Sequence, residues 1–271
     1  MKNNFDHSKN KLNLKVRTGQ FSIIYAKNSS MKIKEEKILD EIEITKGTIA
    51  FIERNLNLNV CVTKEQNREA YMVHALTNDL VRILIKALSP LLSLEPVCKL
   101  SERRLTDKIH RVSGEGINKI LFEGISESKN QVSDIYKIAC LISKSDNPDK
   151  IYWSLCLSAS QYFSDRVRSV IESDLSRKWK LSSISEALSL SEIAVRKKLE
   201  SENTSFYQVL LDVRMQKAAR LILDENHHTD KISSKLGISS TSYFIKMFST
   251  YYGVTPKQFY LHYKSYTNKA S

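Results

Sequence analysis

The chain of 271 residues is poor in the residues that mark several common protein classes, with 7 glycines, 4 prolines and 4 cysteines. So little glycine argues against a Gly-rich nucleotide-binding enzyme, and the scarcity of glycine and proline together excludes a collagen-like chain. No two cysteines form a C-x-x-C pair, which predicts free thiols in a reducing compartment; they stand at Cys61, Cys98, Cys140 and Cys156. We expect no metal site, because zinc ligands are spaced more tightly and adjacent His227 and His228 cannot point the same way on a helix.

Long hydrophobic runs are also lacking. The longest uncharged stretch, residues 151–164, contains several serines and is shorter than the ~20 apolar residues that span a membrane. No apolar h-region follows the polar amino terminus, so no secretory signal is predicted. From these features we expect a cytoplasmic protein without a membrane partner.

Basic residues outnumber acidic ones, 42 to 30, which gives a formal net charge of +12. This balance indicates an anionic partner, with nucleic acid favoured over a membrane surface. The hydrophobic fraction of 41% is sufficient for a packed core, and the length favours two domains over one.

Residues 1–100 are predicted to be rich in β-strand. Short apolar or alternating runs, which are typical of strands, occupy residues 21–25, 48–52, 56–62 and 71–76, and Lys46-Gly47 suits a turn. These runs predict an antiparallel sheet or a small barrel. Residues 79–90 carry apolar side chains on one broad face, which predicts a helix with Asp79 as its N-cap.

Residues 101–162 are predicted to be helical. Apolar residues recur there at helical spacing, and they are Ile117, Ile120, Leu121 and Ile125, then Val132, Ile135, Ile138, Ala139 and Ile142. Either these stripes form ordinary core or they form a helical dimer interface, and the spacing leaves both open. Gly114-Glu115-Gly116 is expected in a polar loop with no preceding strand, so it is a weak nucleotide-binding motif.

One pattern of residues occurs twice in the last third of the chain, over residues 181–200 and 230–249. The apolar positions of the first copy, Ile184, Leu188, Leu190, Val195 and Leu199, correspond to Ile232, Leu236, Ile238, Phe244 and Phe248 of the second. Two apolar residues hold the first helix, one lies in the turn and two hold the second helix, which is how a helix-turn-helix packs. Ser191 and Ser240 stand at N-cap positions, and Gly237 suits a turn with positive φ, where the first copy has Ser189.

A long amphipathic helix is predicted between the two copies, over residues 205–224. Its apolar face is interrupted by Arg214, which is interpreted either as a snorkelling side chain or as a buried arginine that bonds to helix ends. Such a helix would fix the distance between two DNA-reading motifs, which is about 34 Å for successive major grooves on one face of DNA. The tandem repeat therefore predicts a DNA-binding domain over residues 163–271.

From about residue 163 to residue 266 the chain resembles the AraC/XylS-type transcription regulators. Arg214-Met215, with Ala218 and Leu221, matches the linker helix of that family, and residues 251–259 contain its G-x-x-P-x-x-F signature. Over its whole length the chain is most similar to the Rns/ToxT group of enteric virulence regulators, through residues 163–168, 174–179 and 196–203.

This resemblance implies an α+β chain with three parts. Residues 1–100 would form a cupin-like β-barrel that regulates activity, residues 101–162 a helical linker for dimerisation, and residues 163–271 an all-α domain with tandem helix-turn-helix motifs. It also implies an activator of virulence genes that binds AT-rich promoter DNA, acts at the nucleoid, recruits RNA polymerase and forms a homodimer.

Helical geometry and the family alignment select similar residues for DNA contact. In the first recognition helix they are Ile193, Arg196 and Lys197, and in the second they are Thr241, Ser242 and Lys246. Arginine can reach guanine edges with two hydrogen bonds, whereas hydroxyl groups discriminate poorly among bases. We therefore expect the first copy to supply more base readout and the second more positioning.

The group's relatives respond to small molecules, which implies a fatty acid or bicarbonate as effector and no other cofactor. The positions at which acyl-binding relatives carry polar or basic side chains align with Gly19 or Gln20 and with Ala75. The sequence therefore lacks an obvious carboxylate partner there, and Lys15, Arg17, Lys27 and His74 are nearby substitutes. Arg17, Gln20 and His74 are the candidate effector-binding residues, each of which also fits an ordinary surface or core role.

The sequence also bears on other classes of function. No G-x-x-x-x-G-K, G-x-S-x-G or H-E-x-x-H motif occurs, so no enzymatic role and no catalytic residue are predicted. A transcriptional repressor and a protein-interaction module that uses the same helical domain remain as alternatives.

Overall fold

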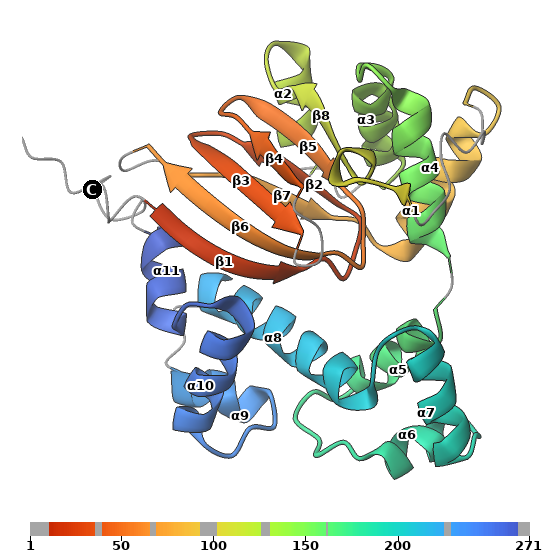
Figure 1. Cartoon of the computed structure of the whole chain (residues 1–271), viewed down its shortest axis with the longest axis vertical. Coiled ribbons are helices and arrows are strands. Elements are labelled where there is room, and N and C mark those ends of the chain that lie inside the picture. The colour runs from red at the N-terminus through yellow and green to blue at the C-terminus, as the bar shows by residue number, and fades with distance from the viewer. Residues whose placement is uncertain are drawn as a thin grey trace, which may run out of the picture. The chain divides into compact units, whose positions relative to one another are not determined.

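The computed structural model describes residues 11–35, 40–65, 69–92, 102–125, 131–160, 162–224 and 229–264. Contacts divide the chain into two compact units, Met1–Ser160 together with Ser265–Ser271, and Gln161–Lys264. Figure 1 shows that the strands belong to the first unit and that the second unit is helical. Cys98, His227 and His228 lie outside the described residues.

The described strands of the first unit pair as two four-stranded antiparallel sheets, ordered β1-β6-β3-β4 and β7-β2-β5-β8. Their bounds are Lys11–Arg17 (β1), Ser22–Ala26 (β2), Ser29–Glu35 (β3), Glu41–Ile44 (β4), Thr48–Ile52 (β5), Asn57–Lys64 (β6), Met72–Ala75 (β7) and Ile109–Ser113 (β8). Consecutive strands cross between the sheets, as from β1 to β2 and from β4 to β5, which builds two layers with open edges (Figure 1). The described strands therefore confirm the predicted antiparallel sheet structure, and they do not close into the small cupin-like barrel that the resemblance implies.

The four strand runs predicted from the sequence are confirmed as β2, β5, β6 and β7, and Gly47 has the positive φ of the predicted turn. Strands β1, β3 and β4 escaped prediction because their outward positions are charged or polar. On β4, for example, exposed Glu41 and Glu43 alternate with buried Ile42 and Ile44.

Four helices and a short 3-10 turn complete the described part of the first unit. They are α1 (Asn78–Leu88), η3 (Leu105–Asp107), α2 (Ile117–Glu123), α3 (Gln131–Ser143) and α4 (Pro148–Ala159). The expectation that residues 101–162 are helical throughout is wrong at β8, which completes a sheet.

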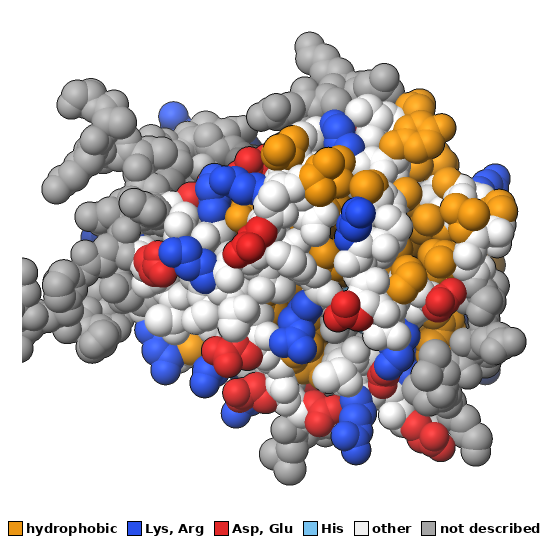
Figure 2. Space-filling model, turned by 90° about the horizontal axis from the view of Figure 1, so that it is seen from above, with side chains coloured by type: hydrophobic (Ala, Val, Ile, Leu, Met, Phe, Trp, Pro, Cys, Tyr) orange, Lys and Arg blue, Asp and Glu red, His pale blue; other side chains and the backbone are white. Residues whose placement is uncertain are grey.

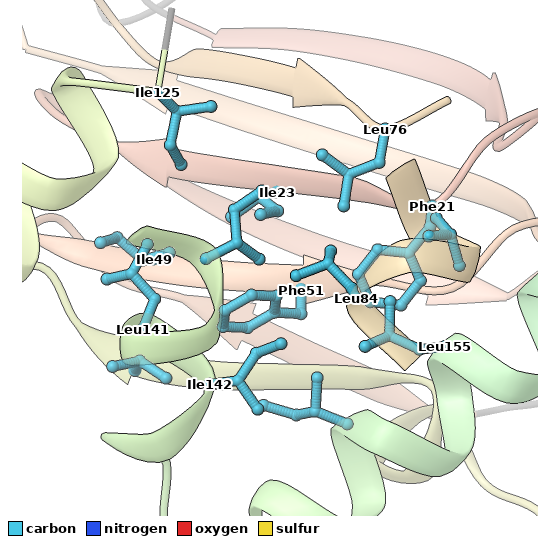
Figure 3. Packing of buried hydrophobic residues seen from close by; sticks show 14 of the residues in the cluster. Phe21, Ile23, Ile49, Phe51, Leu76, Leu84, Ile125, Leu141, Ile142 and Leu155 are labelled. Atoms are coloured by element: carbon cyan, nitrogen blue, oxygen red, sulfur yellow. The ribbon is translucent and has the colours of Figure 1, made fainter. Parts of the chain in front are cut away.

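The main core of this unit lies between the sheet β7-β2-β5-β8 and the helices. Figure 3 shows Ile23 and Phe51 of the sheet facing Leu84 of α1, Ile142 of α3 and Leu155 of α4. Strand β5 is buried at four successive residues, from Ile49 to Ile52, because one of its faces meets the helices and the other meets the second sheet. This explains why β5 has a continuous apolar run whereas strands with one exposed face alternate.

Two local predictions in the first unit are corrected by the structure. The N-cap of α1 is Thr77, whose hydroxyl accepts from the Leu80 amide at 3.3 Å, and not Asp79, which lies inside the first turn. Gly114 does follow a strand, and it is a glycine because a Cβ there would lie 2.5 Å from the Tyr25 ring and 2.6 Å from the Gly47 carbonyl oxygen.

A buried ion pair, which the sequence analysis did not find, joins the sheet to α4. Both nitrogens of the Arg103 fork donate to the Glu53 carboxylate, at 2.9 and 2.6 Å, and one of them also donates to the Ser154 hydroxyl at 3.2 Å. The same hydroxyl lies 3.1 Å from Nε2 of His110 on β8. Burial, followed by the nearby Arg103 charge, lowers the pKa of His110 to about 4, so this imidazole is neutral at pH 7.

The second unit contains seven helices among its described residues: α5 (Phe163–Glu172), α6 (Leu181–Ala187), α7 (Glu192–Ser201), α8 (Phe206–Asp224), α9 (Thr229–Lys235), α10 (Thr241–Tyr252) and α11 (Pro256–Lys264). Figure 1 shows α8 between the group α5–α7 and the group α9–α11. None of the helices that the structure describes in either unit is long and apolar enough to cross a membrane.

Candidate nucleic-acid interface

The first helix-turn-helix, called here the first head, consists of α6 and α7. Val195 and Leu199 of α7 are buried and share one hydrophobic core with Ile184 of α6, Trp179 and the start of α8. The predicted N-cap is confirmed, because the Ser191 hydroxyl accepts from the Ala194 amide at 3.2 Å. The turn requires a left-handed residue, and Ser189 supplies it with a φ of 53°.

The second head consists of α9 and α10. Ile232, Leu236 and Ile238 are buried with Phe244 and Phe248, as the repeat predicted. The Ser240 hydroxyl caps α10 by accepting from the Tyr243 amide at 3.3 Å, and Gly237 occupies the turn with a φ of 66°.

Helix α11 closes the second head and explains the signature in residues 251–259. Gly253 ends α10 in the left-handed conformation, with a φ of 78°, and Pro256 is the first residue of α11. Phe259 is buried, and its ring centroid lies 5.6 Å from that of Phe248. The signature is therefore structural, because it packs α11 against the recognition helix.

The predicted contact residues of the first head lie on one exposed face of α7. Ile193 is 68% exposed, Arg196 and Lys197 are also exposed, and the buried Val195 and Leu199 point the other way. This face therefore presents one apolar and two basic side chains to solvent.

The predicted contact residues of the second head differ in their exposure to solvent. Ser242 and Lys246 are exposed on α10. Thr241 is half-buried at the start of the helix, and its hydroxyl lies 3.4 Å from that of Ser233 in α9. This hydroxyl therefore contacts the head's own first helix.

Two exposed tyrosines near these faces were missed. Tyr243 of α10 is 52% exposed and Tyr207, in the first turn of α8, is 60% exposed. Burial, with the neighbouring Tyr243 phenol and the hydrogen bond that it makes, raises the pKa of Tyr207. Alignment of the two repeats could have identified Tyr243, because this large side chain corresponds to the small Ala194 of the first head.

A basic loop before α6 was also missed as a contact surface. Arg177, Lys178 and Lys180 are exposed there. The Arg177 guanidinium lies 4.5 Å from the centre of the buried Trp179 ring, which holds one of these charges close to the first head. Three cations in four residues were visible in the sequence, but charge alone did not locate the site.

The candidate effector residues are spread over the first unit. Arg17 ends β1 in one sheet, Gln20 lies in the turn before β2, and His74 lies on β7 in the other sheet. All three are half-buried. The His74 ring lies 4.5 Å from that of Phe122, and burial is the main cause that lowers its pKa. No group of three or more metal-ligating side chains occurs in the part of the chain that the structure describes.

The two capped, exposed recognition helices define a DNA-binding protein of the tandem helix-turn-helix class. A family model described as a helix-turn-helix domain matches residues 184–261. The chain is 40% identical to the virulence regulon transcriptional activator VirF of Shigella flexneri over 95% of this chain and 98% of that protein. It is 38% identical to the DNA-binding dual transcriptional regulator Rns of Escherichia coli, over 90% of this chain and 92% of that one.

Solved structures show a similar fold. The crystal structure of an apo ToxT variant from Vibrio cholerae matches with a TM-score of 0.65 at 19% identity, covering 94% of this chain and 93% of that one. A structure of wild-type ToxT from the same species with bound unsaturated fatty acid matches with a TM-score of 0.61 at 17% identity, covering 95% and 94%.

The chain belongs to the AraC/XylS-type transcription regulators, in the group of Rns- and ToxT-like virulence regulators. This family consists of DNA-binding transcription regulators and not of enzymes. The fold class predicted from the sequence, α+β with a carboxy-terminal tandem helix-turn-helix domain, is confirmed.

Proposed function

We propose that this protein activates virulence genes by placing α7 and α10 in successive major grooves of AT-rich promoter DNA. The observation that carries this proposal is the exposed face of α7, where Ile193, Arg196 and Lys197 lie opposite a buried core. The printed names of relatives such as VirF support activation of a virulence regulon. Acting on promoters places the protein in the cytoplasm at the nucleoid, with RNA polymerase as its second partner.

Within this arrangement the two heads have different tasks. Arg196 reads a guanine edge, Lys197 contacts a base or phosphate, and Ile193 contacts a thymine methyl group. Ser242 and Lys246 position the second head, with Thr241 at the start of its helix. The exposed phenols of Tyr207 and Tyr243 and the basic loop before α6 add phosphate contacts, which fix register without reading sequence.

The direct test is a titration of the purified chain against promoter DNA and a scrambled duplex of equal length and composition, at several salt concentrations. The proposal predicts an affinity ratio that persists at physiological salt, because phosphate attraction alone falls steeply as salt rises. Arg196→Ala should weaken promoter binding by about 1–3 kcal/mol and relax the preference at one base pair. Arg82→Ala, which removes a half-buried arginine of the first unit paired with Asp79 at 3.3 Å, is the control for loss of one positive charge and should bind as the parent does.

A repressor would show the same DNA preference, and only a transcription assay with RNA polymerase separates it from an activator. Addition of the chain should raise transcript yield from the promoter template. A protein-interaction module would instead bind the promoter and the scrambled duplex with equal affinity.

The first unit carries exposed apolar side chains that fit a homodimer. Four of them lie on neighbouring helices, Ile117 and Ile120 of α2 with Val132 and Tyr136 of α3, at 57–71% exposure. Figure 2 shows hydrophobic side chains gathered on one side of the face that it displays. Because the dimer-interface interpretation of these two helices requires such exposure, we assign α2 and α3 to the contact between two copies.

A small anionic effector is the last part of the proposal. ToxT binds an unsaturated fatty acid in the solved structure of that protein. In this chain Arg17, Gln20 and His74 are the candidate ligands for a fatty acid or bicarbonate. Thermal-shift titrations with decanoate and with bicarbonate test this proposal. If neither ligand gave a saturable shift, the chain would not be a direct sensor of these ligands.

A further inference from the structure

Residues 174–179, in the loop that connects α5 to α6, are held together by several hydrogen bonds. The Asp174 carboxylate accepts hydrogen bonds from the Ser176 hydroxyl at 2.6 Å, the Ser176 amide at 3.0 Å and the Arg177 amide at 3.2 Å. These bonds, the Ser176 hydroxyl first, lower the pKa of Asp174. The Trp179 indole donates to the Asp174 carbonyl at 2.7 Å, which anchors the loop to the core of the first head.

This loop meets the turn of the second head. A Cβ added to Gly237 would lie 2.8 Å from the carbonyl carbon of Ser176, and closer still to its oxygen. No side chain at position 237 fits in that space, so the turn of the second head meets the backbone of the loop before α6. Gly237 thus meets two requirements, a φ of 66° and a close approach to Ser176.

Arg214 of α8 completes the same contact. Its Nη2 donates to the Arg177 carbonyl at 3.0 Å and lies 3.1 Å from the position of a Cβ on Gly237. Arg214 is half-buried, and this burial lowers the pKa of its guanidinium. It bonds to a loop carbonyl, so the interpretation as a structural arginine fits in part, and the expected bond to a helix end is replaced by the bond to Arg177.

Gly237 lies only a few residues before the N-cap of α10, so its position constrains where that recognition helix begins. The junction joins the loop of the first head, the linker helix and the turn of the second head. It therefore restricts both the distance and the rotation between the two recognition helices. One extra base pair between half-sites shifts the second groove by about 3.4 Å and about a tenth of a turn.

We infer that this head junction, formed by Ser176, Arg177, Arg214 and Gly237, determines which half-site spacing the protein accepts. The inference rests on the proposed DNA-binding function and adds positioning residues that contact no base. Without the junction, α8 alone would join the heads, and the second recognition helix would reach grooves at several spacings.

The test compares Gly237→Ala with Gly253→Ala. Both glycines have a left-handed φ, 66° and 78°, and both lie in the second head, so the backbone strain of the two variants is similar. Gly253 caps the end of α10, whereas Gly237 touches the first head. Each protein is titrated with duplexes in which the mapped half-sites are separated by the natural spacing, or by one base pair more or less.

The parent chain and Gly253→Ala should bind the natural spacing about tenfold more tightly than the altered ones, and Gly237→Ala should reduce this ratio to about threefold or move the optimum. An unchanged ratio and optimum in Gly237→Ala would overturn the inference. If Gly237→Ala does not fold, Arg214→Lys supplies the test, because it keeps the charge and changes the bond to Arg177. A parent chain that binds all duplexes and a scrambled one equally would instead contradict the proposed function.

Discussion

At the scale of single residues, Ser189 adopts a conformation that its side chain disfavours. Its φ of 53° lies in the left-handed region, where residues with a Cβ pay about 1–2 kcal/mol. Ser189→Gly should therefore raise the free energy of unfolding of the second unit by about 1 kcal/mol, measured by chemical denaturation. Asn203→Gly is the matched control: its φ is 54°, but asparagine tolerates this region, so the gain should be smaller.

The neutral His110 makes the first unit sensitive to acid. Its folded pKa of about 4 lies below the usual value of 6.5, so the unfolded chain takes up a proton at a higher pH than the folded one. Stability should be unaffected by this group above pH 7 and fall as pH drops below 6.5, by about 2 kcal/mol at pH 5. His110→Gln should remove that part of the pH slope, measured as the change in unfolding free energy between pH 7.5 and pH 5. An unchanged slope would contradict the burial of a neutral imidazole.

At the scale of elements, the contact of α11 with α10 supports the second head. Phe259→Ala should destabilise this head by about 3–5 kcal/mol, because the ring is buried against Phe248 and Tyr252. Leu261→Ala, a truncation at a 52% exposed position of the same helix, should change stability by less than about 0.5 kcal/mol. Thermal unfolding followed by circular dichroism measures both, and equal losses would mean that α11 does not pack as described.

Helices were predicted better than strands, and the reason is physical. The two heads repeat one pattern of buried residues and serine caps, so local sequence alone indicates both helices and the turn. Strands such as β1 and β3 depend on a partner distant in the chain, since both pair with β6, and Ile33 on β3 lies opposite Val60. The ion pair of Glu53 and Arg103 was likewise invisible, because 50 residues separate two charges that meet in the core.

The candidate site likewise combines local features, which the sequence predicts, with contacts between distant segments. The exposed face of α7 was predicted from helical spacing, because Val195 and Leu199 define its buried side. Tyr207 and the contact of Gly237 with Ser176 could not be derived, because each depends on how separate elements of the second unit meet.

At the scale of the whole molecule, two copies should associate through α2 and α3. Ile120→Lys and Tyr136→Lys place charges at positions that are 70% and 71% exposed, so neither should disturb folding. Sedimentation equilibrium should show a dimer for the parent chain and a weakened dimer for each variant, with unchanged thermal unfolding at concentrations where all are monomeric. Unaltered association in both variants would exclude α2 and α3 as the dimer interface.

The central claim is that both heads read one face of the same DNA. Hydroxyl-radical footprinting of the chain on its promoter tests it most directly. We predict two protected tracts on each strand, separated by about one helical turn of 10 to 10.5 base pairs, with the tract of the first head weakened by Arg196→Ala. A single tract, or uniform protection that disappears with salt, would contradict the account.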